Sequence, residues 1–96
     1  MRRFTQFYVN GNWIDPATPN NFDVTNPADE TIAGVISLGS KSDVDKAVVA
    51  ARSAFTPFSR FSRQERLELL ESILITYNKY YDEIALAISD EMGAPL

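Results

Sequence analysis

Short alternating runs of apolar and polar residues in the first 38 positions predict two β-hairpins. The first covers residues 7–14, "FYVNGNWI", and places Asn10-Gly11 between two runs that contain aromatic side chains. An Asn-Gly pair suits a two-residue type I′ turn, in which both central residues take positive φ. The second covers residues 22–38, where Gly34 interrupts the alternation. A glycine inside a strand is typical of a bulge or of a close backbone approach.

From residue 40 onward, apolar positions recur every three or four residues, which is the spacing of an amphipathic helix. This pattern predicts a first helix over residues 42–55, capped by Ser40 or Ser42. Pro57 is expected to end it, because proline lacks the backbone N–H that a helix interior uses. The three phenylalanines of the linker "FTPFSRF", residues 55–61, are expected to pack on the core.

A longer helix is predicted over residues 63–91. Ser62 and Glu65 have the spacing of a capping box, and Gly93 suits the position just after the last helical residue. Asn78 is the weakest helix former in the middle, so a break is expected near it. The elements together indicate an α+β chain that forms a single unit over residues 1–96.

The apolar side chains of this long helix cover an arc of about 160°, whereas a helix resting on one core usually needs about 100°. Two hairpins and one shorter helix are too few to cover such an arc. Large apolar patches usually find a partner. We therefore expect a homo-oligomer that forms through the long helix.

Composition narrows the possible chemistry. The chain has 96 residues, a net charge of −4, no cysteine and no histidine. Disulfides, thiolate nucleophiles, imidazole bases and imidazole metal ligands are therefore excluded within it. The acidic balance argues against a nucleic-acid partner, and no apolar run approaches the ~18 residues that span a bilayer. The sequence predicts a cytoplasmic protein without a nucleic-acid or membrane partner.

The densest carboxylates lie late in the long helix, at Asp82, Glu83, Asp90 and Glu91. Adjacent side chains on a helix do not face each other, so a solvated polar face is favoured over a metal site. None of the glycines belongs to a phosphate-binding motif. The sequence thus predicts no catalytic, cofactor-binding or metal-binding residue in this chain.

Arginine and aromatic residues offer two weaker candidates. The arginines at positions 60, 63 and 66 lie near phenylalanines, a combination that can stack on a base or hold an anion. Surface arginines are the favoured interpretation in an acidic chain. Tyr8 and Trp13 look like a ligand platform on paper, but a cross-strand pair that stabilises the hairpin is commoner.

The order of the segments resembles the start of the NAD(P)-dependent aldehyde dehydrogenase superfamily. The resemblance rests on "YVNGNWID", "FDVTNPADETIAGVISLGSKSDVDKAVVAARSAF", "RQERLELLESI" and "ISDEMGAPL". Each piece alone is weak, but their order and spacing extend over nearly the whole chain. One departure is Ala94, which stands where the family usually carries lysine.

This resemblance implies an N-terminal structural fragment that is inactive alone. Family members are several times longer and oxidise an aldehyde to a carboxylic acid through a cysteine thiolate, with hydride passing to NAD or NADP. The cysteine, the nucleotide-binding fold and a glutamate that assists hydrolysis lie beyond the corresponding point. Residues 1–96 would then be an incomplete N-terminal part of the nucleotide-binding domain, with the rest of the dehydrogenase as partner.

A second function stays open from the residues alone. The chain could be a stand-alone helical dimerisation or protein-interaction module without enzymatic activity, using the long helix as a groove-binding element.

Overall fold

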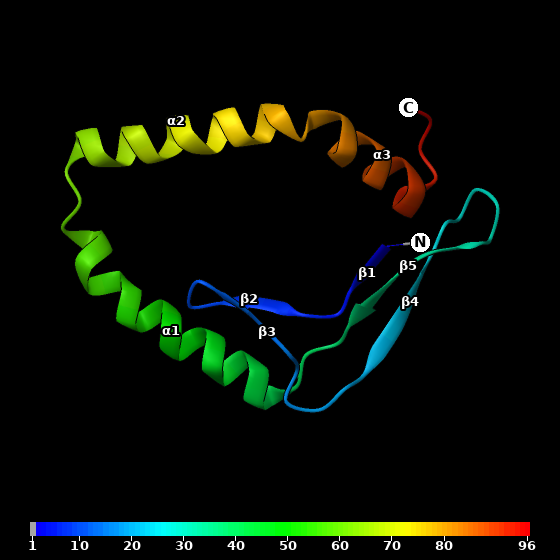
Figure 1. Cartoon of the computed structure of the whole chain (residues 1–96), viewed down its shortest axis with the longest axis horizontal. Coiled ribbons are helices and arrows are strands. Elements are labelled where there is room, and N and C mark those ends of the chain that lie inside the picture. The colour runs from blue at the N-terminus through cyan, green and yellow to red at the C-terminus, as the bar shows by residue number, and fades with distance from the viewer. Residues whose placement is uncertain (1) are drawn as a thin grey trace.

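The computed structural model describes residues 2–96, which form a thin, open frame of strands and helices (Figure 1). Its Cα radius of gyration is 16.9 Å and its extents are 48 × 34 × 15 Å, whereas a compact chain of this length has a radius of about 12.5 Å. The elements in chain order are β1 (Arg2–Phe4), β2 (Phe7–Val9), β3 (Asn12–Ile14), β4 (Asn21–Thr25), β5 (Ile32–Ser37), α1 (Lys41–Ser59), α2 (Arg63–Lys79) and α3 (Tyr81–Met92). This α+β arrangement confirms the predicted fold class.

The first hairpin, β2–β3, forms as the sequence predicts. Asn10 and Gly11 have φ values of 53° and 76°, which confirms the turn with two positive φ angles. Tyr8 pairs directly with Trp13 across the strands, and their ring centroids lie 5.1 Å apart. The aromatic pair therefore supports the hairpin, as the commoner interpretation predicts.

The second hairpin, β4–β5, belongs to a three-stranded sheet in the order β1-β5-β4. β4 pairs antiparallel with β5, which confirms this hairpin. β1 adds in parallel on the other side of β5, opposite Gly34 to Ile36. This third strand was not among the predicted elements, because its partner is distant in sequence and three residues carry no period of their own.

An irregularity in the β4–β5 ladder explains the glycine in β5. Val24 pairs with Gly34 but Thr25 pairs with Ile32, so Ala33 is the extra residue of a bulge. A Cβ on Gly34 would lie 2.9 Å from the Arg2 carbonyl oxygen. Gly34 therefore permits the close approach of β1, and the neighbouring residue supplies the bulge.

Helix α1 begins where the capping signal indicates and ends later than predicted. Ser40 is the N-cap, and its capping box with Asp43 is complete. The prediction that Pro57 ends the helix was wrong, because α1 continues to Ser59. The missing N–H of Pro57 lies in the last turn, and the Arg60 amide closes that turn by donating to the Pro57 carbonyl oxygen at 3.2 Å.

The predicted long helix is two helices, α2 and α3, separated at Tyr80. The capping box at Ser62 and Glu65 is confirmed at the start of α2. The break lies two residues beyond Asn78, where the Tyr80 amide is shared between the Thr76 and Tyr77 carbonyl oxygens. Gly93 ends α3 with φ 72°, which confirms the predicted glycine cap.

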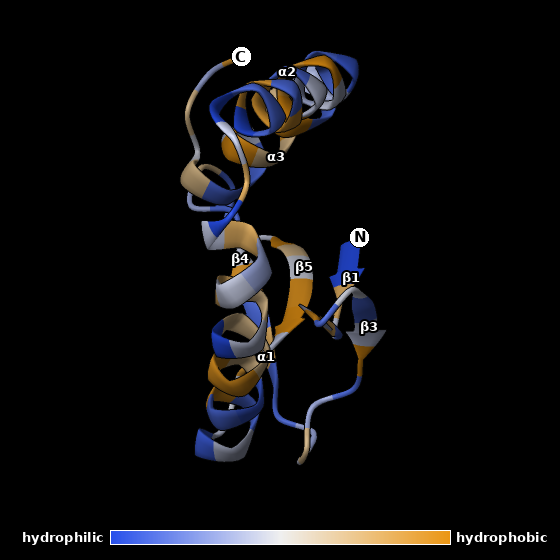
Figure 2. Ribbon diagram, turned by 90° about the vertical axis from the view of Figure 1, so that its left-hand side faces the viewer, coloured by the Kyte–Doolittle hydropathy of each residue, from blue (hydrophilic) through white to orange (hydrophobic). Residues whose placement is uncertain are grey.

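Very little of the described chain is buried. Val35 in β5, 6% exposed, is the one buried apolar side chain among residues 2–96. The expectation that the linker phenylalanines pack on the core was wrong, because Phe55, Phe58 and Phe61 are all exposed. Figure 2 shows hydrophobic residues along all three helices. The strands and helices therefore leave these apolar side chains exposed to solvent.

Candidate functional site

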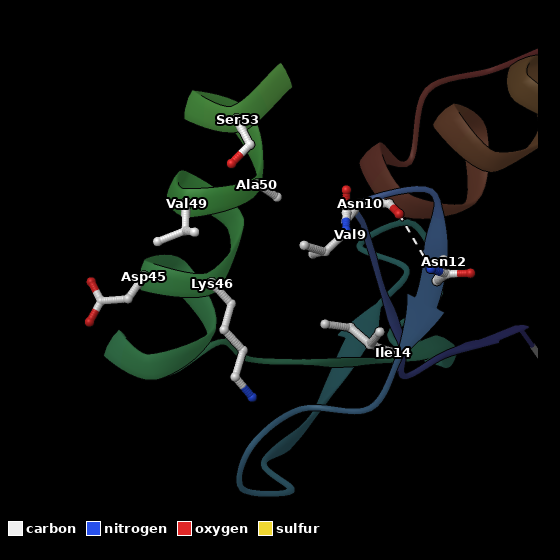
Figure 3. A pocket seen from close by; sticks show the side chains of 9 residues that line it. All are labelled: Val9, Asn10, Asn12, Ile14, Asp45, Lys46, Val49, Ala50 and Ser53. Atoms are coloured by element: carbon white, nitrogen blue, oxygen red, sulfur yellow. Dashed lines mark hydrogen bonds between the residues drawn. The ribbon is translucent and has the colours of Figure 1, made fainter. Parts of the chain in front are cut away.

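An open groove of about 530 Å³ lies between the first hairpin and α1 (Figure 3). Val9 and Ile14 point from the strands toward the helix. Val49 and Ala50 complete its apolar part on the helix side. Its polar lining residues are Asn10, Asn12, Asp45, Lys46 and Ser53.

The charged residues of this groove do not form a catalytic pair. The Asp45 carboxylate and the Lys46 ammonium point in different directions in Figure 3. The one hydrogen bond drawn there runs from the Asn12 side-chain amide to the Asn10 carbonyl oxygen, at 3.3 Å. A nucleophile needs a base within hydrogen-bond reach, and this groove offers none. It can receive an apolar side chain.

The carboxylate-bearing residue Asp43, near the start of α1, is buried, at 6% exposed. It accepts hydrogen bonds from the Ser40 amide at 2.9 Å, the Ser40 hydroxyl at 3.0 Å and the Ala17 amide at 2.9 Å. The Ser40 amide, and after it the Ala17 amide, hold the pKa of the Asp43 carboxyl below its usual value. Asp43 thus ties the loop after β3 to the start of α1.

This carboxylate also occupies the position where a helix would bind an anion. The β5–α1 turn is the one strand-to-helix connection in the part of the chain that the structure describes. Free amides at such a helix start can hold a phosphate. Here the Ser40 amide is already bonded to Asp43, and Gly39 is the single glycine of the turn. The turn therefore does not fit a dinucleotide pyrophosphate.

The loop between β4 and β5 is held by its own side chains. The Asn26 side chain accepts from the Ala28 amide at 2.9 Å. The Asp29 carboxylate accepts from the Thr31 hydroxyl at 2.6 Å and the Thr31 amide at 3.0 Å. These bonds, the hydroxyl first, lower the pKa of Asp29. Glu30 takes φ 63°, which these bonds stabilise within the loop.

The same loop contacts the end of α3. A Cβ placed on Gly93 would lie 3.0 Å from Cγ of Pro27 and 3.2 Å from the Ala28 nitrogen. An ion pair nearby joins Arg2 in β1 to Asp90 in α3. Two contacts therefore fasten the last helix to the sheet.

The carboxylates singled out in the sequence do not converge. Asp90 pairs with Arg2, which the interpretation as a solvated face did not anticipate. Among residues 2–96, no group of three or more histidine, cysteine, aspartate or glutamate side chains is placed to hold a metal ion. Nor does any helix in this range have the length and apolar content to cross a membrane.

The arginine–phenylalanine cluster considered from the sequence forms only in part, from Phe58, Phe61 and Arg66. The Phe58 and Phe61 rings lie 5.2 Å apart, and the Arg66 guanidinium carbon lies 5.9 Å from the Phe58 centroid. Arg66 also donates to the Ser59 carbonyl oxygen at 3.4 Å. Arg66 therefore stabilises the α1–α2 connection, whereas Arg60 and Arg63 form no cation–π contact with these two rings.

The role of Asp43 was only partly visible in the sequence. The Ser40-x-x-Asp43 spacing matches a capping box. The bond to Ala17 crosses 26 positions and has no local signal.

Comparison with known protein families gives one match over most of the chain. The model of the aldehyde dehydrogenase family matches residues 13–96. A 3-succinoylsemialdehyde-pyridine dehydrogenase from Pseudomonas sp is 50% identical over all 96 residues. A putative aldehyde dehydrogenase from Staphylococcus aureus (strain bovine RF122 / ET3-1) is 44% identical over the same length.

Comparison with solved structures gives the same answer. A crystal structure of an aldehyde dehydrogenase from Bartonella henselae has a TM-score of 0.96 and 46% identity, and the match covers 99% of this chain. The chain spans 20% of the length of these curated relatives and 20% of the Bartonella chain.

Proposed function

Given that this chain belongs to the aldehyde dehydrogenase family, we propose that it has a structural role and no catalytic group of its own. In this proposal the 96 residues contribute the N-terminal part of a longer enzyme that oxidises an aldehyde to a carboxylic acid. The 20% coverage of the relatives supports it. The absence of cysteine and histidine from the sequence is in keeping with a part that performs no chemistry.

One observation carries this proposal most strongly. Val35 is the one buried apolar side chain in the described residues, although 45% of the sequence is hydrophobic. A domain that works alone encloses its apolar residues in a core. A chain that exposes them instead is suited to packing against further protein.

The cofactor of the longer enzyme is NAD or NADP in this proposal. That cofactor accepts a hydride from the substrate when bound. The β5–α1 turn does not fit its pyrophosphate, because Asp43 already takes the Ser40 amide. The residues of this chain therefore support the nucleotide-binding domain, as an N-terminal part of it, without touching the phosphates.

Partners and location follow as further parts of the same proposal. The rest of the dehydrogenase is the natural partner, and the isolated chain forms a homo-oligomer through α2 and α3. The exposed apolar residues of these helices support that expectation. The net charge of −4 disfavours nucleic acid, and we place the protein in the cytoplasm.

The alternative function, a stand-alone dimerisation or interaction module, is not favoured. The match to the aldehyde dehydrogenase family extends over residues 13–96 and leaves no separate segment to form such a module.

Two proteins test the proposed function, the isolated chain and a chimera. In the chimera this chain replaces the matching 96 residues of the Pseudomonas dehydrogenase. We expect the chimera to reduce NAD or NADP with that enzyme's own aldehyde. The isolated chain should give no aldehyde-dependent reduction and no calorimetric NAD binding tighter than about 1 mM. Turnover by the isolated chain, or an inactive but folded chimera, would contradict the proposal.

A further inference from the structure

The chain exposes far more surface than a folded protein of its mass. Its solvent-accessible surface is 7835 Å², whereas a compact monomer of 10.8 kDa exposes about 5,500 Å². The surplus of about 2,300 Å² compares with about 800 Å² that each partner contributes to a standard interface. A second copy that covered one interface of standard size would leave most of the surplus open.

α2 carries part of this surplus, because none of its residues is buried. Ile73 and Leu70 are 55% and 63% exposed. At ~100° per residue they lie in one arc of about 160°. We call this face the α2 apolar stripe; its members are Leu67, Leu69, Leu70, Ile73, Leu74 and Tyr77.

The opposite face of α2 is polar and provides a natural reference. Ile75 lies there, 71% exposed, at about 160° from the centre of the stripe. Glu71 and Glu68 flank it on the helical wheel, one on each side. A single apolar residue on a polar face needs no partner.

The break between α2 and α3 adds a receiving groove beside the stripe. An open groove of about 380 Å³ lies there. α2 ends there at Lys79 and α3 begins at Tyr81. Its lining residues are Ser72, Ile73, Thr76, Tyr77, Tyr80 and Ile84. Apolar grooves of this kind receive the large anchor side chains that dominate binding energy at interfaces.

We propose that the remaining four fifths of the dehydrogenase fold covers the α2 apolar stripe and inserts an apolar anchor side chain into the α2–α3 groove. This inference rests on the proposed function. Two observations identify what covers the stripe. The exposed surplus is larger than one standard interface, and this chain spans only 20% of relatives whose other 80% could supply the covering surface. When the rest of the dehydrogenase is absent, the isolated chain self-associates through the same stripe.

The absence of cysteine from this chain allows a direct test by thiol labelling. Ile73→Cys places a thiol in the stripe, and Ile75→Cys places a matched thiol on the polar face. Both are made in the chimera described above, and alkylation by iodoacetamide is followed for each peptide by mass spectrometry. We expect the thiol at position 73 to react on the order of 100-fold more slowly than that at position 75.

The other outcomes distinguish a failure of this inference from a failure of the proposed function. Equal rates in an active chimera would overturn it and leave the proposed function standing. Protection at position 73 that disappears on dilution would identify a second copy as the occupant and overturn it too. A chimera without a cooperative unfolding transition would show that the stripe does not fit this partner. Protection in a folded but inactive chimera would support the covering and contradict the proposed function.

Discussion

The Arg2 guanidinium donates to the Asp90 carboxylate across 3.1 Å and 88 positions of sequence. Arg2 lies in β1 and Asp90 in α3, so this pair closes the frame that α1, α2 and α3 form (Figure 1). Gly93 and Pro27 close it a second time, one turn further along. The two closures differ in kind, because one is electrostatic and the other is steric.

The electrostatic closure should contribute little to stability. The two side chains are 31% and 36% exposed, and ion pairs of such exposure are typically worth below about 1 kcal/mol. Asp90→Asn should therefore lower the free energy of unfolding by less than that, and less still in 1 M NaCl. Urea unfolding at one fixed protein concentration checks this, since association shifts apparent stability. A larger, salt-independent loss would show that Asp90 does more than pair with Arg2.

The steric closure should matter more. Gly93→Ala puts a side chain at φ 72° and within 3.0 Å of Pro27, so a loss on the order of 1–3 kcal/mol is expected. Gly11→Ala is the matched control, because Gly11 has φ 76° and a Cβ there would meet nothing within 4 Å. Equal urea midpoints for the two variants would mean that α3 does not rest on the β4–β5 loop.

The turn of the first hairpin gives a prediction that depends on backbone alone. Gly11 has φ 76°, and a Cβ there would meet nothing within 4 Å. Gly11→Val should therefore cost on the order of 1–3 kcal/mol through backbone strain. Gly11→Asn should cost much less, since asparagine tolerates positive φ. Near-ultraviolet circular dichroism of the Tyr8–Trp13 pair reports the result, and an unchanged signal in the valine variant would count against this geometry.

The Asp43 anchor should make stability depend on pH in the acid range. Its pKa in the folded chain is lowered below 3.8, so its contribution is present above that pH and is lost as the pH falls through the folded value. Asp43→Asn should destabilise the chain at pH 7, and the difference from the unaltered chain should shrink below pH 3.8. Asp29, whose pKa is also lowered, contributes in the same direction, so the comparison is repeated in an Asp29→Asn background, where that second contribution is absent. A difference that does not change with pH would refute the anchor.

The sequence predicted the elements whose signals are local. Asn10-Gly11 determines the first turn through two positive φ angles, and the Ser62–Glu65 box determines where α2 begins. Both depend on residues within four positions of one another. Hence the hairpin and the helix start could be recognised without any tertiary contact.

The features that were missed depend on distant partners or on competing effects. β1 is a strand only because β5 lies beside it, and Asp43 reaches Ala17 across the sheet-to-helix corner. Pro57 was expected to end α1, but its missing N–H lies only two residues before the helix ends at Ser59, and the Arg60 amide donates to the Pro57 carbonyl oxygen. The exposure of the three linker phenylalanines could not be predicted either, because the sequence does not show whether an apolar linker residue packs against its own chain or against another protein.

The central claim is that these 96 residues leave the α2 apolar stripe for another protein surface to cover. Burial of a standard interface of about 1,600 Å², a little over half of it apolar, contributes about 23 kcal/mol before an association cost of about 4–15 kcal/mol. The isolated chain should therefore associate through this stripe at micromolar concentration. Leu70→Asp should weaken the association, whereas Ile75→Asp, with the same charge on the polar face, should not.

Sedimentation equilibrium of the isolated chain tests this claim most directly. At about 100 µM, well above the micromolar range in which association is expected, the account predicts a dimer or larger species for the unaltered chain and the Ile75→Asp variant, and a shift toward monomer for Leu70→Asp. A monomer for the unaltered chain at that concentration would contradict the account, because it would show that the chain folds its own apolar faces inward.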